Sequence, residues 1–257
     1  IYHSPPLSWQ LINPSVIAQK IKVPVVFDLR AADLVHGGEG APITPVADFI
    51  LFRDNAENRS VINLGGFCNV TEVPGILIDN LNLEYWLSLV KGFDLCPCNH
   101  LLDKISRDLI GKPFDKDGEN ALTGSTHKES FDNLLLILKS MFTENRSLGT
   151  GDETSGWISR FSDDVIAVDL ARTACAAIAQ MIVDSVDSDR IILAGGGMKN
   201  AALVGEITSR FSGKVSTSNE FGIPSDHREA IEMAILGALC QDRIPITLPQ
   251  VTGSKSE

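Results

Sequence analysis

Residues Lys91 to Ile105 read KGFDLCPCNHLLDKI and hold several side chains that could do chemistry. Asp94 follows an apolar Gly-Phe pair, so its carboxylate would be partly desolvated. Desolvation raises the basicity of a carboxylate toward the value that a general base needs. The same side chain could instead cap a helix or bind within a loop, which is a common role for aspartate. The local sequence is compatible with both roles.

The cysteines of this stretch, Cys96 and Cys98, flank Pro97. A structural zinc ion needs four ligands, and His100 is the one further candidate nearby. A disulfide within Cys-Pro-Cys is disfavoured, because the proline holds the two side chains in poor geometry. The segment FDKDGEN, residues 114–120, lacks the ligand pattern of an EF-hand and predicts a turn. We therefore expect the two cysteines to pack as small apolar side chains, and we predict no metal ligands.

Two glycine turns follow apolar, strand-like runs. NLGGFCNV begins at Asn63, and LAGGGMKN begins at Leu193. Glycine permits positive φ and a close approach of phosphate or adenine, while amides at a following helix start face negative charge. Neither turn matches GxxxxGK[ST] or GxGxxG, which disfavours a Rossmann dehydrogenase. Each turn taken alone is more often a tight connection than a ligand site.

The elements that must position these groups alternate between strand and helix. Apolar β-branched runs predict strands, and apolar residues at helical spacing predict helices that begin and end at polar residues and glycine. Asn99 is the expected N-cap of one helix and Gly111 its C-terminal stop. This order predicts an α/β fold with a largely parallel sheet. The expected strands are 23–29, 47–52, 60–64 and 190–194, and the expected helices are 99–111, 131–141, 163–186, 199–211 and 228–242.

Composition excludes several classes of function. The chain has 257 residues, of which 44% are hydrophobic, and a net charge of -11. Nucleic-acid binding depends on clustered Lys and Arg, which are not seen, and no apolar run is long enough to cross a bilayer. The five cysteines have scattered spacings that suit a reducing compartment, so we expect a cytoplasmic protein. The chain opens on Ile1 without an initiator methionine, so further sequence is expected upstream.

Six motifs in a fixed order resemble the anhydro-N-acetylmuramic acid kinase family, from about Val23 to Gly253. They are DLRAADLVHGGEGAPITP, INLGGFCNVTEVP, GFDLCPCN, FDKDG, AGGGMKNAAL and LPQVTG. The resemblance implies an actin-like ATPase architecture, with ribonuclease H-like α/β domains around a nucleotide cleft. Residues 1–57 would then be the remainder of a first α/β domain whose N-terminal part is missing. Residues 58–257 would form the second domain with a C-terminal interdomain helix.

The resemblance also implies a reaction and its ligands. Such enzymes use ATP with Mg²⁺ to open the ring of 1,6-anhydro-N-acetylmuramic acid hydrolytically and to phosphorylate its O6, in peptidoglycan recycling. The implied partners are the amino sugar and ATP, with a possible homodimer and without nucleic acid or membrane. The residue roles carried over by position are as follows: Asp94 as the base that activates water; Arg30 and Glu229 at the sugar; Gly65, Gly66 and Asn69 near the nucleotide phosphates; Gly195, Gly196 and Gly197 as the adenosine motif.

Elementary chemistry leaves alternatives for two of these residues. The planar guanidinium of Arg30 suits a lactyl carboxylate or an acetamido group, but it could also be a surface side chain. Glu229 opens an amphipathic helix, where the helix dipole favours a carboxylate whatever its function.

The chain departs from the family in two places. The family usually has GFDTGPGN where this chain has GFDLCPCN, so Leu95, Cys96 and Cys98 replace one threonine and two glycines. The family's N-terminal phosphate loop, rich in glycine and serine, has no counterpart in this sequence. The alternative reading is therefore a non-catalytic or degenerate nucleotide-binding homologue. A carbohydrate-binding module is disfavoured, because three Trp and two Tyr are few for such a surface.

Overall fold

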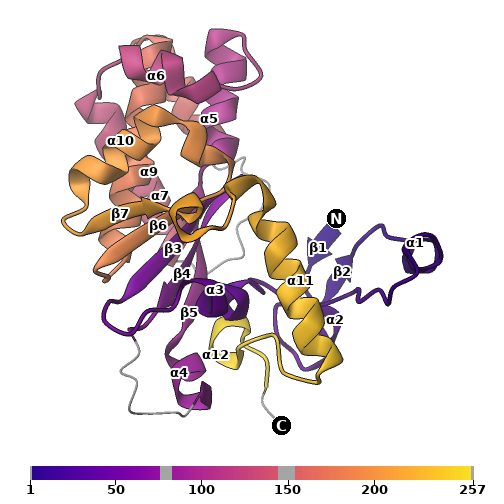
Figure 1. The fold of residues 1–257 in the computed structure, drawn as a ribbon. Helices are drawn as coiled ribbons and strands as arrows, with labels where there is room; N and C mark the ends of the chain where they lie inside the picture. The colour runs from indigo at the N-terminus through magenta and orange to yellow at the C-terminus, as the bar shows by residue number, and fades with distance from the viewer. Residues whose placement is uncertain (1, 76–82, 144–153, 256–257) are drawn as a thin grey trace. The chain divides into compact units, whose positions relative to one another are not determined.

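The structure is a computed structural model that describes residues 2–75, 83–143 and 154–255 (Figure 1). The chain forms two compact units, each built from separate stretches of sequence. The first comprises Ile1–Glu57, Thr71–Phe93 and His227–Glu257, and the second comprises Asn58–Val70 and Asp94–Asp226. The domain division expected from the sequence, 1–57 and 58–257, stays a prediction.

The first unit is mainly helical in its described residues. Its elements are β1 (Tyr2–Ser4), β2 (Leu7–Trp9), α1 (Pro14–Ile21), α2 (Ala31–Val35), α3 (Pro45–Phe52), α4 (Leu83–Leu89), α11 (Arg228–Gln241) and α12 (Pro249–Thr252). The short strands β1 and β2 pair in an antiparallel manner, and α11 packs against α3.

The second unit alternates strands and helices. Its strands are β3 (Arg59–Leu64), β6 (Arg190–Ala194) and β7 (Lys214–Thr217), and its α-helices are α5 (Asn99–Ile105), α6 (Glu119–Thr123), α7 (Lys128–Thr143), α8 (Ser155–Phe161), α9 (Ala167–Ser185) and α10 (Ala201–Arg210). Its short helical turns are the π-helical η1 (Ser106–Ile110) and the 3-10 turns η2 (Lys116–Gly118), η4 (Gly196–Lys199), η5 (Ser218–Phe221) and η6 (Ser225–His227). The last residue of η6, His227, is assigned to the first unit. Two strands, β4 (Phe67–Val73) and β5 (Lys91–Pro97), have residues in both units.

The five strands form one sheet in the order β5-β4-β3-β6-β7. Strands β3 and β6 run parallel with Val61 opposite Ile192, and β6 and β7 run parallel with Ile192 opposite Ser216. Nearly all residues of β3 and β6 are buried, as expected for parallel strands that are covered on both faces. The predicted α/β class and the parallel character of these strands are confirmed.

Helix α9 is the central helix of the second unit. Eleven of its 19 residues are buried, and it contacts α5, α6, α7 and α10 (Figure 1). Its many alanines, from Ala171 to Ala179, let neighbouring helices approach closely. Within the described residues, no helix combines the length and the apolar character that crossing a bilayer requires.

Most predicted elements are confirmed, with small shifts at their ends. The helices predicted at 131–141, 163–186, 199–211 and 228–242 correspond to α7, α9, α10 and α11. The helix predicted at 99–111 is α5 followed by η1, and Gly111 ends it with a φ of 78°. The N-cap is Cys98 and not Asn99, which is already the first helical residue and whose side chain donates to the Leu64 carbonyl at the end of β3.

Two predicted strands are wrong. Residues 47–52 lie in α3, whose first turn opens on Pro45, a residue that suits the first helical position. A short apolar run buried on several sides has no periodicity that separates strand from helix. Residues 23–29 form neither strand nor helix, and Val23 and Phe27 are about half exposed. Strand propensity depends on packing against neighbours, and these exposed side chains have little of it.

Candidate active site

The turn between β3 and β4 binds the start of α5 through its backbone. The Gly65 carbonyl accepts a hydrogen bond from Asn99 N at 3.0 Å, and the Gly66 carbonyl accepts from Cys98 N at 2.9 Å and His100 N at 3.1 Å. A Cβ on Gly66 would collide with the His100 ring. Glycine at position 66 thus lets the turn lie directly against the start of α5, where a larger residue would have to displace the exposed His100 ring.

The second glycine turn meets the first at the carboxyl ends of adjacent parallel strands. Gly195 has a φ of 82°, and a Cβ on Gly197 would lie 2.7 Å from the Leu64 Cβ at the end of β3. Asn99 Nδ2 donates to the Leu64 carbonyl at 3.0 Å and so links α5 to the same point. The structure thus brings together both glycine motifs predicted from the sequence. Open α/β sheets bind ligands at this edge.

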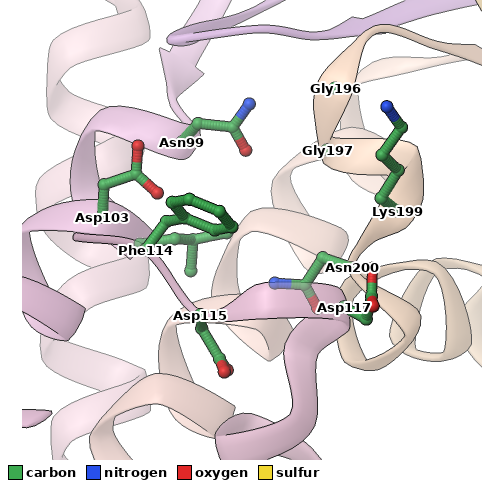
Figure 2. A pocket seen from close by; sticks show the side chains of 10 residues that line it. Asn99, Asp103, Phe114, Asp115, Asp117, Gly196, Gly197, Lys199 and Asn200 are labelled. Carbon is green, nitrogen blue, oxygen red and sulfur yellow. The ribbon is translucent and has the colours of Figure 1, made fainter. Parts of the chain in front are cut away.

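A pocket of about 230 Å³ opens beside the second turn (Figure 2). Figure 2 shows the Phe114 ring next to Asp103, across the pocket from Lys199. The pocket is lined by Asn99, Leu102, Asp103, Phe114, Asp115, Asp117, Gly196, Gly197, Lys199 and Asn200. Gly196 and Gly197 of the predicted adenosine motif belong to this lining, whereas Gly65, Gly66, Asn69 and Gly195 do not.

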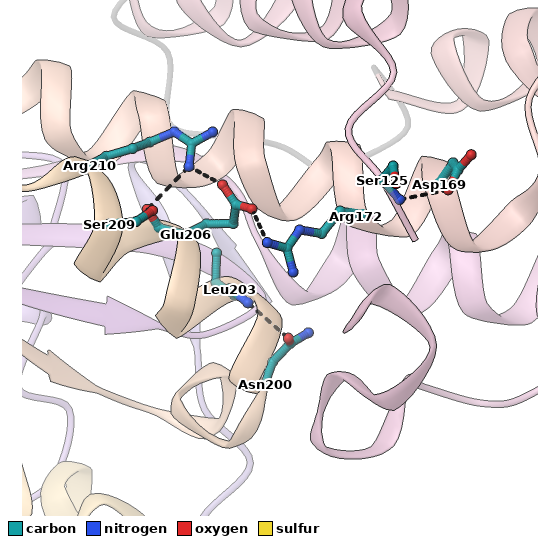
Figure 3. Close-up of polar contacts among 8 residues, drawn as sticks. All are labelled: Ser125, Asp169, Arg172, Asn200, Leu203, Glu206, Ser209 and Arg210. Carbon is teal, nitrogen blue, oxygen red and sulfur yellow. Dashed lines mark hydrogen bonds and ion pairs between the residues drawn. The ribbon is translucent and has the colours of Figure 1, made fainter. Parts of the chain in front are cut away.

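Two polar residues of the lining are engaged in helix capping. The Asp115 carboxylate accepts from Asn120 N at 3.0 Å and from Ala121 N at 2.9 Å, at the start of α6. Asn200 Oδ1 accepts from Leu203 N at 3.0 Å and caps α10 (Figure 3). These bonds fix the walls of the pocket and explain why FDKDG and AGGGMKN have polar residues at these positions.

Asp103 and Phe114 give the pocket its chemical character. Burial raises the pKa of the Asp103 carboxyl above its usual value, and the positive charges of Arg107 and His100 oppose the shift. The Phe114 ring is 53% exposed and so presents an open aromatic surface. Lys199 Nζ lies 2.9 Å from Asp226 Oδ1, and both side chains are exposed, so this ion pair contributes little stability. The pocket therefore offers a flat apolar ring, a hydrogen-bond acceptor and the backbone of a glycine turn.

Helix α10, which follows the pocket's glycine turn, is tied to α9 by a buried carboxylate. Glu206 is 5% exposed and lies between Arg172, whose Nη2 is 2.5 Å from Oε1, and Arg210, which binds Oε2 (Figure 3). Ion pairs of this kind are weak evidence for stability, but they fix the relative position of two helices.

Asp94 is held by Asn69 across two adjacent strands. Asn69 lies on β4 and Asp94 on β5, and the Asn69 amide donates to Asp94 Oδ1. Both side chains are half-buried. The amide fixes the rotamer of the carboxylate, as a general base requires. The resemblance to the kinase family implied that Asn69 lies near the nucleotide phosphates, and no local signal in the sequence indicated its bond to Asp94.

The residues that replace the family's Thr-Gly-Pro-Gly pattern are core residues. Leu95, Cys96 and Cys98 are all fully buried, which confirms the prediction that the cysteines pack as apolar side chains. Burial raises the pKa of the Cys98 thiol well above its usual value, so the reactive thiolate is suppressed. Within the part of the chain that the structure describes, no three His, Cys, Asp or Glu side chains are placed to hold a metal ion.

The two predicted sugar-binding residues lie in the first unit. Arg30 is half-buried, and its Nη1 donates to the Gly40 carbonyl. Glu229 is exposed in the first turn of α11. Asp103 and Phe114, by contrast, were not predicted from the sequence. The exposed aromatic at the start of FDKDG was the one signal that could have indicated the pocket.

These features define a class of protein: an α/β protein whose glycine turns meet beside a pocket at the carboxyl ends of parallel strands. The sequence model of one family, anhydro-N-acetylmuramic acid kinase, matches residues 1–257. The chain belongs to this family, as its motifs predicted.

Curated relatives carry the same name. The chain is 32% identical to the anhydro-N-acetylmuramic acid kinase of Synechococcus sp. (strain CC9902), and the match covers 100% of this chain and 72% of the relative. It is 31% identical to that of Salinibacter ruber (strain DSM 13855 / M31), over 96% of this chain and 64% of the relative. The chain therefore spans about two thirds to three quarters of the length of these relatives.

Solved structures share distant similarity. One is the activator of the 2-hydroxyisocaproyl-CoA dehydratase from Clostridium difficile with bound ADPNP, with a TM-score of 0.44 and 14% identity over 79% of this chain and 68% of that chain. Another is a ROK family glucokinase from Streptomyces griseus in complex with glucose and AMPPNP, with a TM-score of 0.30 and 13% identity over 89% of this chain and 72% of that chain.

Proposed function

We propose that this protein is an ATP-dependent kinase that opens 1,6-anhydro-N-acetylmuramic acid hydrolytically and phosphorylates its O6, in peptidoglycan recycling. The observation that carries the proposal is the family match over residues 1–257. No comparison favours the degenerate homologue that the departures in GFDLCPCN suggested. The substituted residues of this motif are buried core side chains. They leave the hydrogen bond between Asn69 and Asp94 in place.

The nucleotide belongs in the pocket beside Gly196 and Gly197. The Phe114 ring can stack on the flat face of a purine, as aromatic side chains commonly do with bases. The Asp103 carboxyl can accept a hydrogen bond from the adenine amino group or a ribose hydroxyl. Gly65 and Gly66, at the neighbouring strand end, are the proposed phosphate contacts, with Asn69 beyond them.

Mg²⁺ would accompany ATP. Such an ion is usually held by phosphate oxygens, water and one or two carboxylates, and it needs no cage made only of protein ligands. When bound, the ion would neutralise charge on the transferring phosphoryl group.

The protein's own residues would prepare the sugar for attack. Asp94, oriented by Asn69, would take a proton from the water that attacks the anomeric carbon. Arg30 would bind a carboxylate or acetamido group of the sugar, and Glu229 would accept from its hydroxyls. Phosphoryl transfer itself depends mainly on positioning and charge stabilisation, so no covalent intermediate on the protein is needed.

Product analysis tests the reaction. Incubation with the anhydro sugar, ATP and Mg²⁺ should give a product whose mass exceeds that of the substrate by one water and one phosphoryl group. Omitting ATP should leave the anhydro sugar intact. An opened sugar without phosphate, or a phosphate on an intact anhydro ring, would contradict the coupled reaction.

A glycine variant tests the position of the nucleotide. A Cβ on Gly196 would have Asn99 Nδ2, at 4.0 Å, as its nearest neighbour, so Gly196→Val should fold while its side chain fills part of the pocket. We expect the affinity for a non-hydrolysable ATP analogue to fall by roughly tenfold or more. Calorimetry measures this directly, and saturating analogue should stabilise the unchanged protein by about 2.7 kcal/mol at a hundredfold excess over Kd.

Gly205→Val is the matched control for this variant. Gly205 lies on α10, and a Cβ there would meet nothing within 4 Å. It should bind the analogue like the unchanged protein. Equal affinity in the Gly196 and Gly205 variants would place the nucleotide elsewhere.

A further inference from the structure

A glycine-rich loop in the first unit, residues 37–40, packs against the buried carboxylate of Asp33. Asp33 is 3% exposed, and its Oδ2 accepts a hydrogen bond from Gly40 N at 2.8 Å. A Cβ on Gly38 would collide with the same carboxylate, so the loop backbone lies directly against it. Asp33 therefore sets the position of the loop.

The second oxygen of Asp33 is bound by the C-terminal segment. Thr252 is 1% exposed, and its Oγ1 donates to Asp33 Oδ1 at 2.6 Å. The backbone adds two further bonds to this brace, from Glu39 N to the Thr252 carbonyl at 2.8 Å and from Lys255 N to the His36 carbonyl at 3.0 Å. The LPQVTG motif, more than two hundred residues along the chain from the loop, thus holds it in place.

Gly40 connects this brace to Arg30. The Gly40 N–H binds Asp33, and the Gly40 carbonyl accepts from Arg30 Nη1. Gly40 has a φ of 66°, which other residues rarely adopt, and the bonds with Asp33 and Arg30 hold this conformation from both of its peptide groups. A displacement of Asp33 would therefore move the guanidinium through a single residue.

We propose that Asp33 and Thr252 are positioning residues that fix the Arg30 guanidinium for the anionic or acetamido group of the sugar. The inference rests on the proposed function, because it takes Arg30 as a sugar ligand. A guanidinium binds a carboxylate through two parallel N–H bonds, and this geometry is lost when the planar fork rotates or shifts. The Thr252 hydroxyl orients the Asp33 carboxylate so that its other oxygen faces the loop.

Thr252→Val tests the proposal, because valine keeps the shape of threonine and removes only the hydroxyl. We expect the KM for the anhydro sugar to rise by roughly tenfold, because a displaced Arg30 guanidinium would lose the equivalent of one charge-assisted hydrogen bond to the sugar. The KM for ATP should stay within about twofold. Thr252→Ser keeps the hydroxyl, so its sugar KM should lie close to that of the unchanged protein.

Thr71→Val is a matched control in the same unit. Thr71 is 4% exposed, and its hydroxyl donates to another buried aspartate, Asp48, at 2.7 Å. This variant should lower the melting temperature about as much as Thr252→Val and leave the sugar KM unchanged. Hydrogen exchange at Gly40 N–H should accelerate in the Thr252 variant and not in the Thr71 variant.

The outcomes separate the inference from the function beneath it. A raised sugar KM together with faster Gly40 exchange in Thr252→Val alone supports the positioning role. A sugar KM that is equal in the two valine variants, in a protein that turns over the sugar, overturns the inference and leaves the proposed function standing. Failure of the unchanged protein to consume the sugar overturns both.

Discussion

Asp94→Asn is expected to lower kcat by about a hundredfold to ten-thousandfold, the usual contribution of a general base. Asparagine keeps the size of the side chain and loses the basic oxygen that would take a proton from water. The Asn69 amide can still donate to the remaining carbonyl oxygen, so the local fold should be kept. Affinity for the ATP analogue should be unchanged, because Asp94 is not part of the nucleotide pocket's lining. Steady-state kinetics and calorimetry on the same preparation check both expectations.

The double variant Cys96→Ala and Cys98→Ala is the control for Asp94→Asn. Both thiols are fully buried, so their removal should cost stability by leaving small cavities and should change kcat only slightly. Unchanged turnover in the Asp94 variant would refute its role as the base. A collapse of turnover in the folded double cysteine variant would show that the thiols take part in the chemistry.

The sequence predicts those parts of the fold whose signals are local. Helices α9, α10 and α11 have long periodic patterns, and Gly111 ends a helix through its own backbone preference. Residues 47–52 were misassigned because a helix buried on several sides has the same apolar run as a buried strand. Tertiary burial, which one short run of sequence does not encode, decides between them.

The candidate site divides in the same way. The glycine turns were predicted because glycine at a strand end has a backbone reason that shows in the sequence. The contact between Asn69 and Asp94 depends on how β4 pairs with β5, and Phe114 reaches its pocket through the course of the chain after η1. Such contacts join residues whose relation is set only by the folded sheet and helices.

A buried charge cluster in the first unit could likewise not be predicted from local sequence patterns. Arg228 and Asp48 are 3% and 1% exposed, and Arg228 Nη2 lies 2.5 Å from Asp48 Oδ1. Glu232, 1% exposed, places Oε1 2.7 Å from the same Nη2. The cluster thus has two carboxyl groups and one guanidinium. Burial and the nearby Asp48 charge raise the pKa of Glu232 to about 9. Glu232 is therefore protonated near neutral pH, and Arg228 compensates the charge of Asp48.

Arg228→Met is expected to destabilise the protein by about 3–5 kcal/mol, the usual cost of removing one partner from a buried ion pair. Methionine fills much of the same volume, so the main loss is the positive charge. The Asp48 carboxylate would remain buried with the Thr71 hydroxyl and the Glu232 carboxyl as its neighbours. Denaturant unfolding at pH 7 measures the change. A loss below about 1 kcal/mol, the value of an exposed pair, would show that the cluster is solvated.

Glu232→Gln is the control for Arg228→Met, because its effect on stability should become more favourable as pH rises. The pKa of Glu232 is raised in the fold from 4.5 to about 9, so folding takes up a proton between these values. The stability that Glu232 contributes is fully present below pH 4.5 and is lost progressively as pH rises to about 9. Glutamine mimics the protonated form and has no such dependence. Its stability relative to the unchanged protein should therefore increase from pH 5 to pH 8, while Arg228→Met stays destabilised throughout. If the stability difference instead stayed constant from pH 5 to pH 8, Glu232 would be ionised in the fold throughout this range, and Arg228 would balance two negative charges.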